Sequence, residues 1–171
     1  MTDRPLRVAV LTISDRSSAG QRPDLSGPAL AAEIEKFGWV CVQTAVVPDE
    51  ISQIASILVN WADSGQSDLI LTTGGTGFSP RDVTPEATRA VLHRETPGIA
   101  EAVRSRSLAV TPHAMLSRAV SGIRGKSLII NLPGSPKAAV ESLGFIAAVL
   151  PHAVQLISED PQSEQSHHFN L

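Results

Sequence analysis

The sequence predicts one α/β domain, a three-layer sandwich in which helices cover both faces of a mostly parallel central sheet. Short runs rich in Val, Leu and Ile alternate with amphipathic helical patterns, an order typical of parallel sheets with helical crossovers. Glycines, prolines and capping residues separate these segments. The 171 residues are enough for one domain with a substantial core. We expect this domain over residues 1–157 and a flexible polar tail over residues 158–171.

The first half of the chain alternates between apolar strand patterns and helical patterns. The predicted elements are a strand over residues 6–13, a polar loop over 14–25, a helix over 28–37, a strand over 39–47, a helix over 51–62 and a strand over 69–73. Ser26 precedes the first helix, and Gly38 is placed to end it. In the second helix, Ile51, Ile54 and Leu58 fall on one face, which we expect to be buried.

The second half predicts three helices and one more strand. The elements are a helix from Thr84 to about His93, a helix over residues 99–110, a strand over 127–132 and a helix from Pro136. Thr84 is a candidate cap with Pro85 at the first helical position, and Pro97 and Gly98 separate two helices. Because a proline inside a helix removes a hydrogen bond, we expect the last helix to kink or restart at Pro151.

The most informative stretch joins the 69–73 strand to a glycine bend and an acid. Gly74, Gly75 and Gly77 lack side chains, so the backbone around Thr76 can adopt positive φ and point its N–H groups at an anion. Asp82 follows, where a bound nucleotide would need a magnesium ligand. The alternative is a tight strand-to-helix turn that binds nothing.

A second bend follows the 127–132 strand. Pro133, Gly134 and Ser135 form the turn, Ser135 offers a capping hydroxyl, and Pro136 suits the first helical position. In open α/β sheets, ligands bind outside the carboxyl ends of the strands, so two such bends would form opposite walls of one pocket. The alternative for this segment alone is a well-capped helix.

Composition and charge exclude several classes of protein. The net charge is −3, and aromatic residues make up 4% with no tyrosine, which argues against nucleic-acid binding. No N-terminal signal pattern is present and no segment reads as long enough to span a membrane. The single Cys41, which we expect in the core, forms no internal disulfide, so we expect a cytoplasmic protein. Local cations must hold any anionic substrate, and the candidates are Arg16, Arg22, Arg81, Arg118 and Lys137.

Six motifs follow one another along the chain, at residues 12–16, 47–50, 73–77, 80–86, 116–118 and 131–134. Together they resemble the MogA/MoaB family of molybdenum cofactor biosynthesis, and the resemblance runs from about Leu6 to Ile157. The segment Arg81 to Glu86 is more similar to MogA and the G domain of gephyrin than to the MoaB branch.

This resemblance implies molybdopterin adenylyltransferase activity, in which ATP and molybdopterin give adenylylated molybdopterin and pyrophosphate. It also implies Mg²⁺ as the metal, a homotrimer, and contacts with other proteins of molybdenum cofactor biosynthesis. Asp82 and Asp49 are then the catalytic, metal-side acids, with Asp82 placing magnesium and phosphate. Helix capping is the competing structural role for both acids, and more so for Asp49.

The resemblance also assigns binding residues on each side of the pocket. The nucleotide would contact Thr12, Ser14, Asp15, Gly74, Gly75, Thr76, Gly77, Pro133, Gly134 and Ser135. Ser117 and Arg118 would contact molybdopterin, with Ser117 not acting as a nucleophile because direct in-line transfer needs none.

Two alternatives to the enzyme remain at this point. One is a trimeric molybdopterin-binding or scaffold protein without catalysis, and the other is a nucleotide-binding domain that acts on a different phosphorylated metabolite. Asp49 and Asp82 favour the enzyme, because a pure binder has no need for two carboxylates beside polyanionic ligands.

Overall fold

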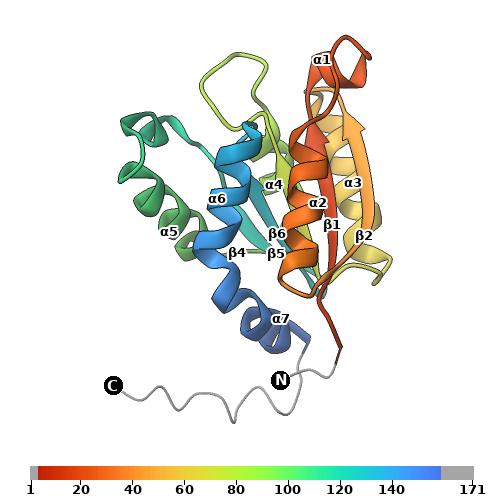
Figure 1. The fold of residues 1–171 in the computed structure, drawn as a ribbon. Coiled ribbons are helices and arrows are strands. Elements are labelled where there is room, and N and C mark those ends of the chain that lie inside the picture. The colour runs from red at the N-terminus through yellow and green to blue at the C-terminus, as the bar shows by residue number, and fades with distance from the viewer. Residues whose placement is uncertain (1–3, 159–171) are drawn as a thin grey trace.

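A six-stranded sheet forms the middle layer of the computed structural model, which describes residues 4–158 (Figure 1). Its strands are β1 (Arg7–Ile13), β2 (Val40–Val47), β3 (Leu69–Thr73), β4 (Arg94–Glu95), β5 (Ser121–Arg124) and β6 (Ser127–Leu132). The order is β2-β1-β3-β6-β5-β4, in which the first four strands are parallel and β5 pairs antiparallel with both β6 and β4. The mostly parallel sheet is confirmed. The sequence did not predict β4 and β5, whose two and four residues are too short for a periodic pattern.

Helices cover both faces of the sheet, which confirms the three-layer sandwich (Figure 1). The helices are α1 (Asp15–Ser18), α2 (Ser26–Lys36), α3 (Ile51–Asp63), α4 (Thr84–Val91), α5 (Pro97–Leu108), α6 (Pro136–Ile146) and α7 (Leu150–Ser158), with 3₁₀ turns η1 (Pro112–Leu116) and η2 (Ala147–Val149). Core side chains of α2, α5, α6 and α7 pack on one face, and those of α3 and α4 pack on the other.

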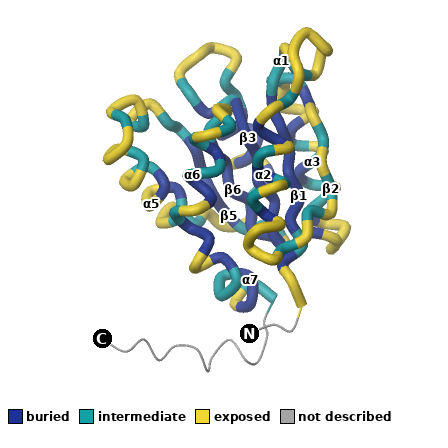
Figure 2. Tube along the Cα trace, in the orientation of Figure 1, coloured by how far each residue is buried: buried dark blue, intermediate teal, exposed yellow. Residues whose placement is uncertain are grey.

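The core divides at the sheet because strand side chains alternate between its faces. In β1, Val8 and Val10 join the cluster under α2 and α6, whereas Ala9 and Leu11 join the cluster under α3 and α4. All four are at most 1% exposed. Figure 2 shows the buried strands between helices whose outer sides are exposed.

Two helices begin differently from the prediction. The region expected to be a polar loop contains the one-turn helix α1, which Ser14 caps by accepting a hydrogen bond from the N–H of Ser17. Helix α2 begins at Ser26 itself. The carboxylate of Asp24 caps this helix, because it accepts hydrogen bonds from the N–H groups of Ser26 and Gly27.

Three further expectations were wrong in detail. Thr84 is not a cap: it is the first residue of α4, and its hydroxyl donates to the carbonyl of Gly74 at 2.9 Å. Pro97 opens α5 instead of separating two helices, because its missing N–H costs nothing at the first helical position. Ile51, expected on the buried face of α3, is 45% exposed, since the face that packs on the sheet is made by Ile54, Leu58 and Ala62.

The last helical stretch restarts near Pro151, as predicted, with η2 separating α6 from α7. By length and composition the 23 residues Pro136–Ser158 could cross a membrane, contrary to the expectation that no segment could. Here the apolar side chains of this stretch pack on the sheet, where Leu143, Ile146 and Leu150 belong to the core. Cys41 is partly buried against the same core. Of the predicted tail, Ser158 ends α7 and the remainder lies outside the described residues.

A carboxylate clamp fixes the amino end of β1. The buried side chain of Asp68 accepts hydrogen bonds from the guanidinium groups of Arg4 and Arg7 and from the backbone N–H of Arg7 at 2.8 to 3.2 Å. Burial alone would raise the pKa of Asp68, but these hydrogen bonds outweigh it and lower the pKa to about 2. The folded state therefore favours the ionised carboxylate.

We expect Asp68→Asn to lower the free energy of unfolding by about 2 kcal/mol at neutral pH. Because the pKa falls from 3.8 to about 2 on folding, this stabilisation is present above the higher value and is lost as pH falls towards the lower one. Urea unfolding at about pH 7 and about pH 3 measures both effects, with the variant less dependent on pH than the wild type. Asp63→Asn is the control, because Asp63 forms an exposed pair with Arg124; an equal loss there would contradict a special role for Asp68.

Candidate active site at the carboxyl ends of the parallel strands

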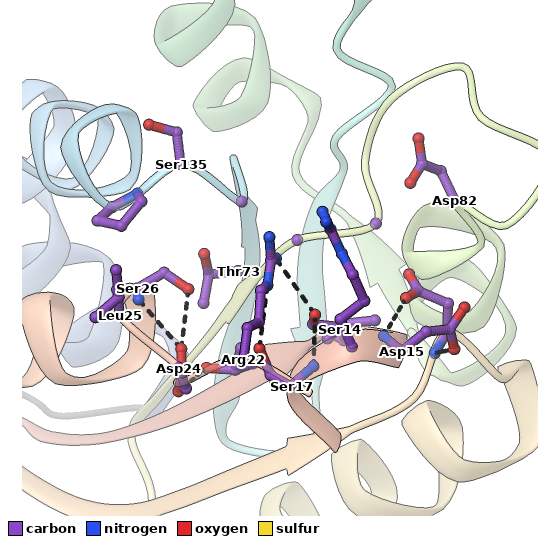
Figure 3. A pocket seen from close by; sticks show the side chains of 18 of the residues that line it. Ser14, Asp15, Ser17, Arg22, Asp24, Leu25, Ser26, Thr73, Asp82 and Ser135 are labelled. Atoms are coloured by element: carbon purple, nitrogen blue, oxygen red, sulfur yellow. Dashed lines mark hydrogen bonds between the residues drawn. The ribbon is translucent and has the colours of Figure 1, made fainter. Parts of the chain in front are cut away.

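A polar cleft of about 610 Å³ lies where β1 and β3 end, the point at which the chain reverses the direction in which it adds strands. Such switch points are where open α/β sheets bind ligands. Segments that follow β1, β2, β3 and β6 all contribute to the lining (Figure 3). The lining includes nine predicted site residues, which are Thr12, Ser14, Asp15, Asp49, Gly74, Gly75, Asp82, Gly134 and Ser135.

The bend after β3 has a backbone that only glycine accommodates. Gly74 has φ 106° and Gly75 has φ 63°, both in the left-handed half of the map. A β-carbon on Gly74 would lie 2.2 Å from the carbonyl oxygen of Ile13, and one on Gly75 would lie 2.4 Å from Oγ1 of Thr84 and 2.8 Å from Oδ1 of Asp49. The missing side chains therefore let the bend lie against β1 and against an acid of the cleft.

The two predicted bends touch each other and do not stand on opposite walls. A β-carbon on Gly134 would lie 3.2 Å from Cα of Gly74, and the N–H of Gly74 donates to the carbonyl of Leu132 at 3.2 Å. The hydroxyl of Thr73 donates to the carbonyl of Pro133 at 2.7 Å. Ser135 caps α6 and Pro136 occupies its first turn, as predicted. Both bends thus form one continuous wall.

This wall presents free hydrogen-bond donors. The N–H of Gly74 is used by Leu132, but within residues 4–158 those of Gly75, Gly134 and Ser135 donate to no protein group. All three residues line the cleft. Backbone N–H groups gathered in this way suit an anion such as a phosphate.

Asp15 and Asp49 hold each other in place. The N–H of Asp15 donates to the carboxylate of Asp49, and the N–H of Asp49 donates to the carboxylate of Asp15, each at 3.0 Å. Helix α3 begins after Glu50 without a side-chain cap, so Asp49 does not have the capping role that competed with function. Its carboxylate is directed to the cleft and to Asp15.

The surroundings of Asp15 and Asp49 shift the pKa values of the two carboxyl groups in opposite directions. Hydrogen bonds from Arg81, at 2.9 and 3.0 Å, and from the N–H of Asp49 lower the pKa of Asp15. Burial, together with the charges of Asp15 and Asp82, raises the pKa of Asp49. Arg81 also binds Glu50 at 2.8 Å, so this cation of the cleft is already paired with two carboxylates. Asp49 is therefore the acid with most to gain from a cation brought by a ligand.

Asp82 lines the cleft from the loop that follows the glycine bend (Figure 3). Its carboxylate accepts a hydrogen bond from the N–H of Ser79 at 2.9 Å, and its backbone N–H donates to the carbonyl of Ser79. A β-carbon on Gly77 would lie 2.9 Å from its Oδ2. Asp82 does not cap α4, whose cap position is Val83.

Sequence reasoning missed Asp24, which organises the wall after β1. Besides capping α2, Asp24 accepts a hydrogen bond from the buried hydroxyl of Thr12 at 2.8 Å. An aspartate two residues before a helix start is a capping signal that could have identified it. Arg22, Arg16 and Ser17 also line the cleft. The guanidinium of Arg22 donates to the hydroxyls of Ser14 and Ser17, which are neutral (Figure 3).

Other predicted site residues lie behind the cleft lining. Thr76, Gly77 and Pro133 belong to the bends but do not line the cleft, and neither do Ser117 and Arg118. Lys137, one of the candidate cations, also lies outside it and is paired with Glu141 at 3.8 Å. The hydroxyl of Ser117 accepts a hydrogen bond from the N–H of Ala119. Within one chain the structure does not bring Ser117 and Arg118 to the cleft face of the wall formed by the two bends.

The acids of the cleft suit a metal that arrives with a ligand. Among residues 4–158 there is no group of three or more His, Cys, Asp or Glu side chains that could hold a metal ion alone. Asp49 and Asp82 are hard oxygen ligands that line the cleft beside the glycine bend, Asp49 next to Gly75 and Asp82 next to Gly77. Magnesium in proteins commonly takes one or two carboxylates and completes its shell with water and substrate phosphates.

Comparisons with known proteins agree on one family. Residues 9–152 match the family described as "Probable molybdopterin binding domain". Gephyrin of Dictyostelium discoideum is 50% identical over 166 residues, which cover 91% of this chain and 23% of gephyrin. The chain thus spans about a quarter of the length of that curated relative.

Two similar proteins match over nearly their whole length. The molybdopterin adenylyltransferase of Helicobacter pylori strain J99 is 43% identical over 154 residues, covering 89% of this chain and 88% of the relative. The crystal structure of the molybdopterin biosynthesis enzyme MoaB from Thermus thermophilus superposes with a TM-score of 0.85 at 49% identity, covering 91% of this chain and 98% of that one.

We expect Gly75→Ala to destabilise the protein more than Gly65→Ala. Both glycines have positive φ, 63° and 68°, but a β-carbon meets Thr84 and Asp49 at Gly75 and nothing within 4 Å at Gly65. The control therefore costs only the left-handed backbone penalty of about 1–2 kcal/mol, while Gly75→Ala adds a packing cost of about 1–3 kcal/mol. Urea unfolding of both variants gives the difference. Equal losses would show that the bend can yield without disturbing Asp49.

Proposed function

We propose that this chain, which belongs to the molybdenum cofactor biosynthesis family described as a probable molybdopterin binding domain, is a molybdopterin adenylyltransferase. It would transfer AMP from ATP to the terminal phosphate of molybdopterin and release pyrophosphate. The observation that carries the proposal is the continuous wall of two bends, whose free N–H groups line the same cleft as Asp49 and Asp82. The name of the Helicobacter relative, which this chain covers almost fully, supports the same activity.

The reaction asks for positioning and charge stabilisation more than for covalent catalysis. An oxygen of the terminal phosphate of molybdopterin attacks the α-phosphorus of ATP, a new P–O bond forms, and the bond between that phosphorus and the oxygen bridging to the β-phosphate breaks. Negative charge grows on the departing pyrophosphate. Two anions must also be brought together, which orientation in a cleft can favour by about 7–11 kcal/mol.

The residues of the cleft can divide these tasks. The N–H groups of Gly75, Gly134 and Ser135 would hold the phosphates of ATP without adding a side chain that blocks approach. Asp82 and Asp49 would hold the magnesium ion that ATP carries, and magnesium bound there neutralises charge on the leaving phosphates. Arg81, held by Asp15 and Glu50, keeps Asp15 ionised and fixed beside Asp49.

The second candidate is a protein of this family that binds molybdopterin without adenylylating it. The free donors of the wall would serve either protein. The raised pKa of Asp49 favours the enzyme, because an acid buried beside two other acids is unfavourable next to polyanions unless a cation joins it. We therefore place the enzyme first.

We further propose that the protein is a cytoplasmic homotrimer that contacts other proteins of molybdenum cofactor biosynthesis. The resemblance of its motifs supports this state, and so does an exposed apolar segment at the end of α5 and in η1. Leu108, Val110, Met115 and Leu116 of that segment are 41% to 63% exposed. Ser117 follows directly, so a neighbouring subunit packed here would adjoin a residue expected near molybdopterin.

Purified protein with ATP, magnesium and molybdopterin should release pyrophosphate and form the adenylylated pterin. Asp82→Asn should lower turnover on the order of 100-fold or more, because it removes a charge that acts on the phosphates. Asn keeps an oxygen that can accept from Ser79, so the thermal unfolding midpoint should change little. Coupled detection of pyrophosphate measures the rate. Molybdopterin binding without any pyrophosphate release would favour the binding protein instead.

Light scattering at micromolar concentration should give three times the 18.0 kDa mass of one chain. Met115→Glu should shift this mass towards one chain, since a charge placed in a buried apolar contact is unfavourable. Lys126→Glu, at an exposed residue of the β5–β6 turn, is the matched control and should leave the mass unchanged. A wild-type mass of one chain would contradict the trimer.

A further inference from the structure

Arg118 does not line the cleft, but its side chain contacts two residues that lead from the glycine bend to α4. Its Nε donates to the carbonyl of Gly77 at 2.7 Å, and its Nη2 donates to the carbonyl of Asp82 at 2.6 Å. Nη1 and Nη2 both bind the carboxylate of Glu86, in the first turn of α4. The backbone N–H of Arg118 donates to the carbonyl of Thr76 at 2.8 Å.

These contacts join both ends of one loop. Gly77 ends the glycine bend, and Asp82 ends the loop that leads to α4. A guanidinium group is planar and has its donors in fixed directions, so one side chain sets the separation of both carbonyls. Within the loop, Asp82 and Ser79 exchange two hydrogen bonds, one of which holds the carboxylate of Asp82 against the loop backbone.

We propose that Arg118 is a positioning residue that aims the carboxylate of Asp82 into the cleft by fixing the backbone of Gly77 and Asp82 from behind. The inference rests on the proposed function, in which Asp82 acts on the nucleotide phosphates. It replaces the expectation that Arg118 contacts molybdopterin, because every nitrogen of the guanidinium is engaged within the chain and none faces the cleft.

The charge balance around Arg118 supports this role. Glu86 pairs with the guanidinium, and hydrogen bonds from Arg118 lower the pKa of Glu86, which favours its ionised form. Within residues 4–158 these contacts use four of the five guanidinium N–H groups, so a two-point contact of Arg118 with a phosphate would have to displace at least one of them. Glu86 instead fixes the side-chain orientation that lets the other donors reach Gly77 and Asp82.

The test compares Arg118→Gln, Arg118→Lys and Arg124→Gln in the adenylyl transfer assay. Arg118→Gln should lower kcat by about 10–100-fold, since a displacement of about 1 Å at a reacting centre can cost 100-fold. Arg118→Lys should recover only part of the rate, because one ammonium cannot hold two carbonyls at a set separation. Arg124→Gln removes a similar carboxylate-and-carbonyl clamp, to Asp63 and Val91 away from the cleft, and should leave kcat unchanged.

A double-mutant cycle separates positioning from a direct role. In the Asp82→Asn background, adding Arg118→Gln should cost less than about 3-fold further, because Arg118 acts through Asp82. The dissociation constant for molybdopterin should be the same for Arg118→Gln and the wild type. Independent, multiplying losses would overturn the proposal, and so would weakened molybdopterin binding with an unchanged kcat.

Amide hydrogen exchange tests the clamp without relying on catalysis. Arg118→Gln should speed exchange at the N–H groups of Ser79 and Asp82, while exchange in the buried strand β6 stays as in the wild type. If the wild type shows no adenylyl transfer but exchange changes in this way, the proposed function fails and the positioning contact stands. Unchanged exchange in the loop would overturn the positioning role whatever the assay shows.

Discussion

The contact between two glycine bends determines the geometry of this site. Gly74 and Gly134 lie so close that a β-carbon on Gly134 would be 3.2 Å from Cα of Gly74, and Gly74 donates its N–H to the end of β6. Parallel pairing of β3 with β6 brings both bends to one edge of the sheet. Larger side chains would force the strand ends apart and separate the N–H groups that now line one wall.

Electrostatics then decides what this wall can bind. The free N–H groups attract an anion, whereas Asp15, Asp49 and Asp82 would repel it. Among residues 4–158, Arg81 forms an ion pair with Asp15 but not with Asp49 or Asp82, and the pKa of Asp49 is raised. A ligand that brings phosphate and divalent cation together satisfies both groups at once, which a free anion does not. MgATP has this composition, and a pterin phosphate alone lacks it.

The sequence predicted the strands and bends whose residues form a recognisable local pattern. The strands β1, β2, β3 and β6 follow from apolar runs, and the two bends follow from glycine and proline placement. The short antiparallel strands β4 and β5 could not be predicted, because their pairing is set by contact with β6 and not by periodicity. Thr84 illustrates the same limit, since its hydroxyl serves the distant Gly74 and not its own helix.

The same difference between local pattern and long-range contact separates the site residues that the sequence predicted from those whose roles it missed. Asp49, Asp82, Gly74, Gly75 and Gly134 belong to compact motifs, so the sequence located them in one cleft. Asp24 and Arg118 act through partners that are distant along the chain or belong to another element, Thr12 for one and Gly77, Asp82 and Glu86 for the other. A sequence motif can indicate that a residue is functional, but it does not show which atoms the side chain contacts in the folded protein. Arg118 lies in a motif whose resemblance suggested a contact with a ligand. Its guanidinium instead donates to the backbone carbonyls of Gly77 and Asp82, and the side chain that reaches the cleft is that of Asp82.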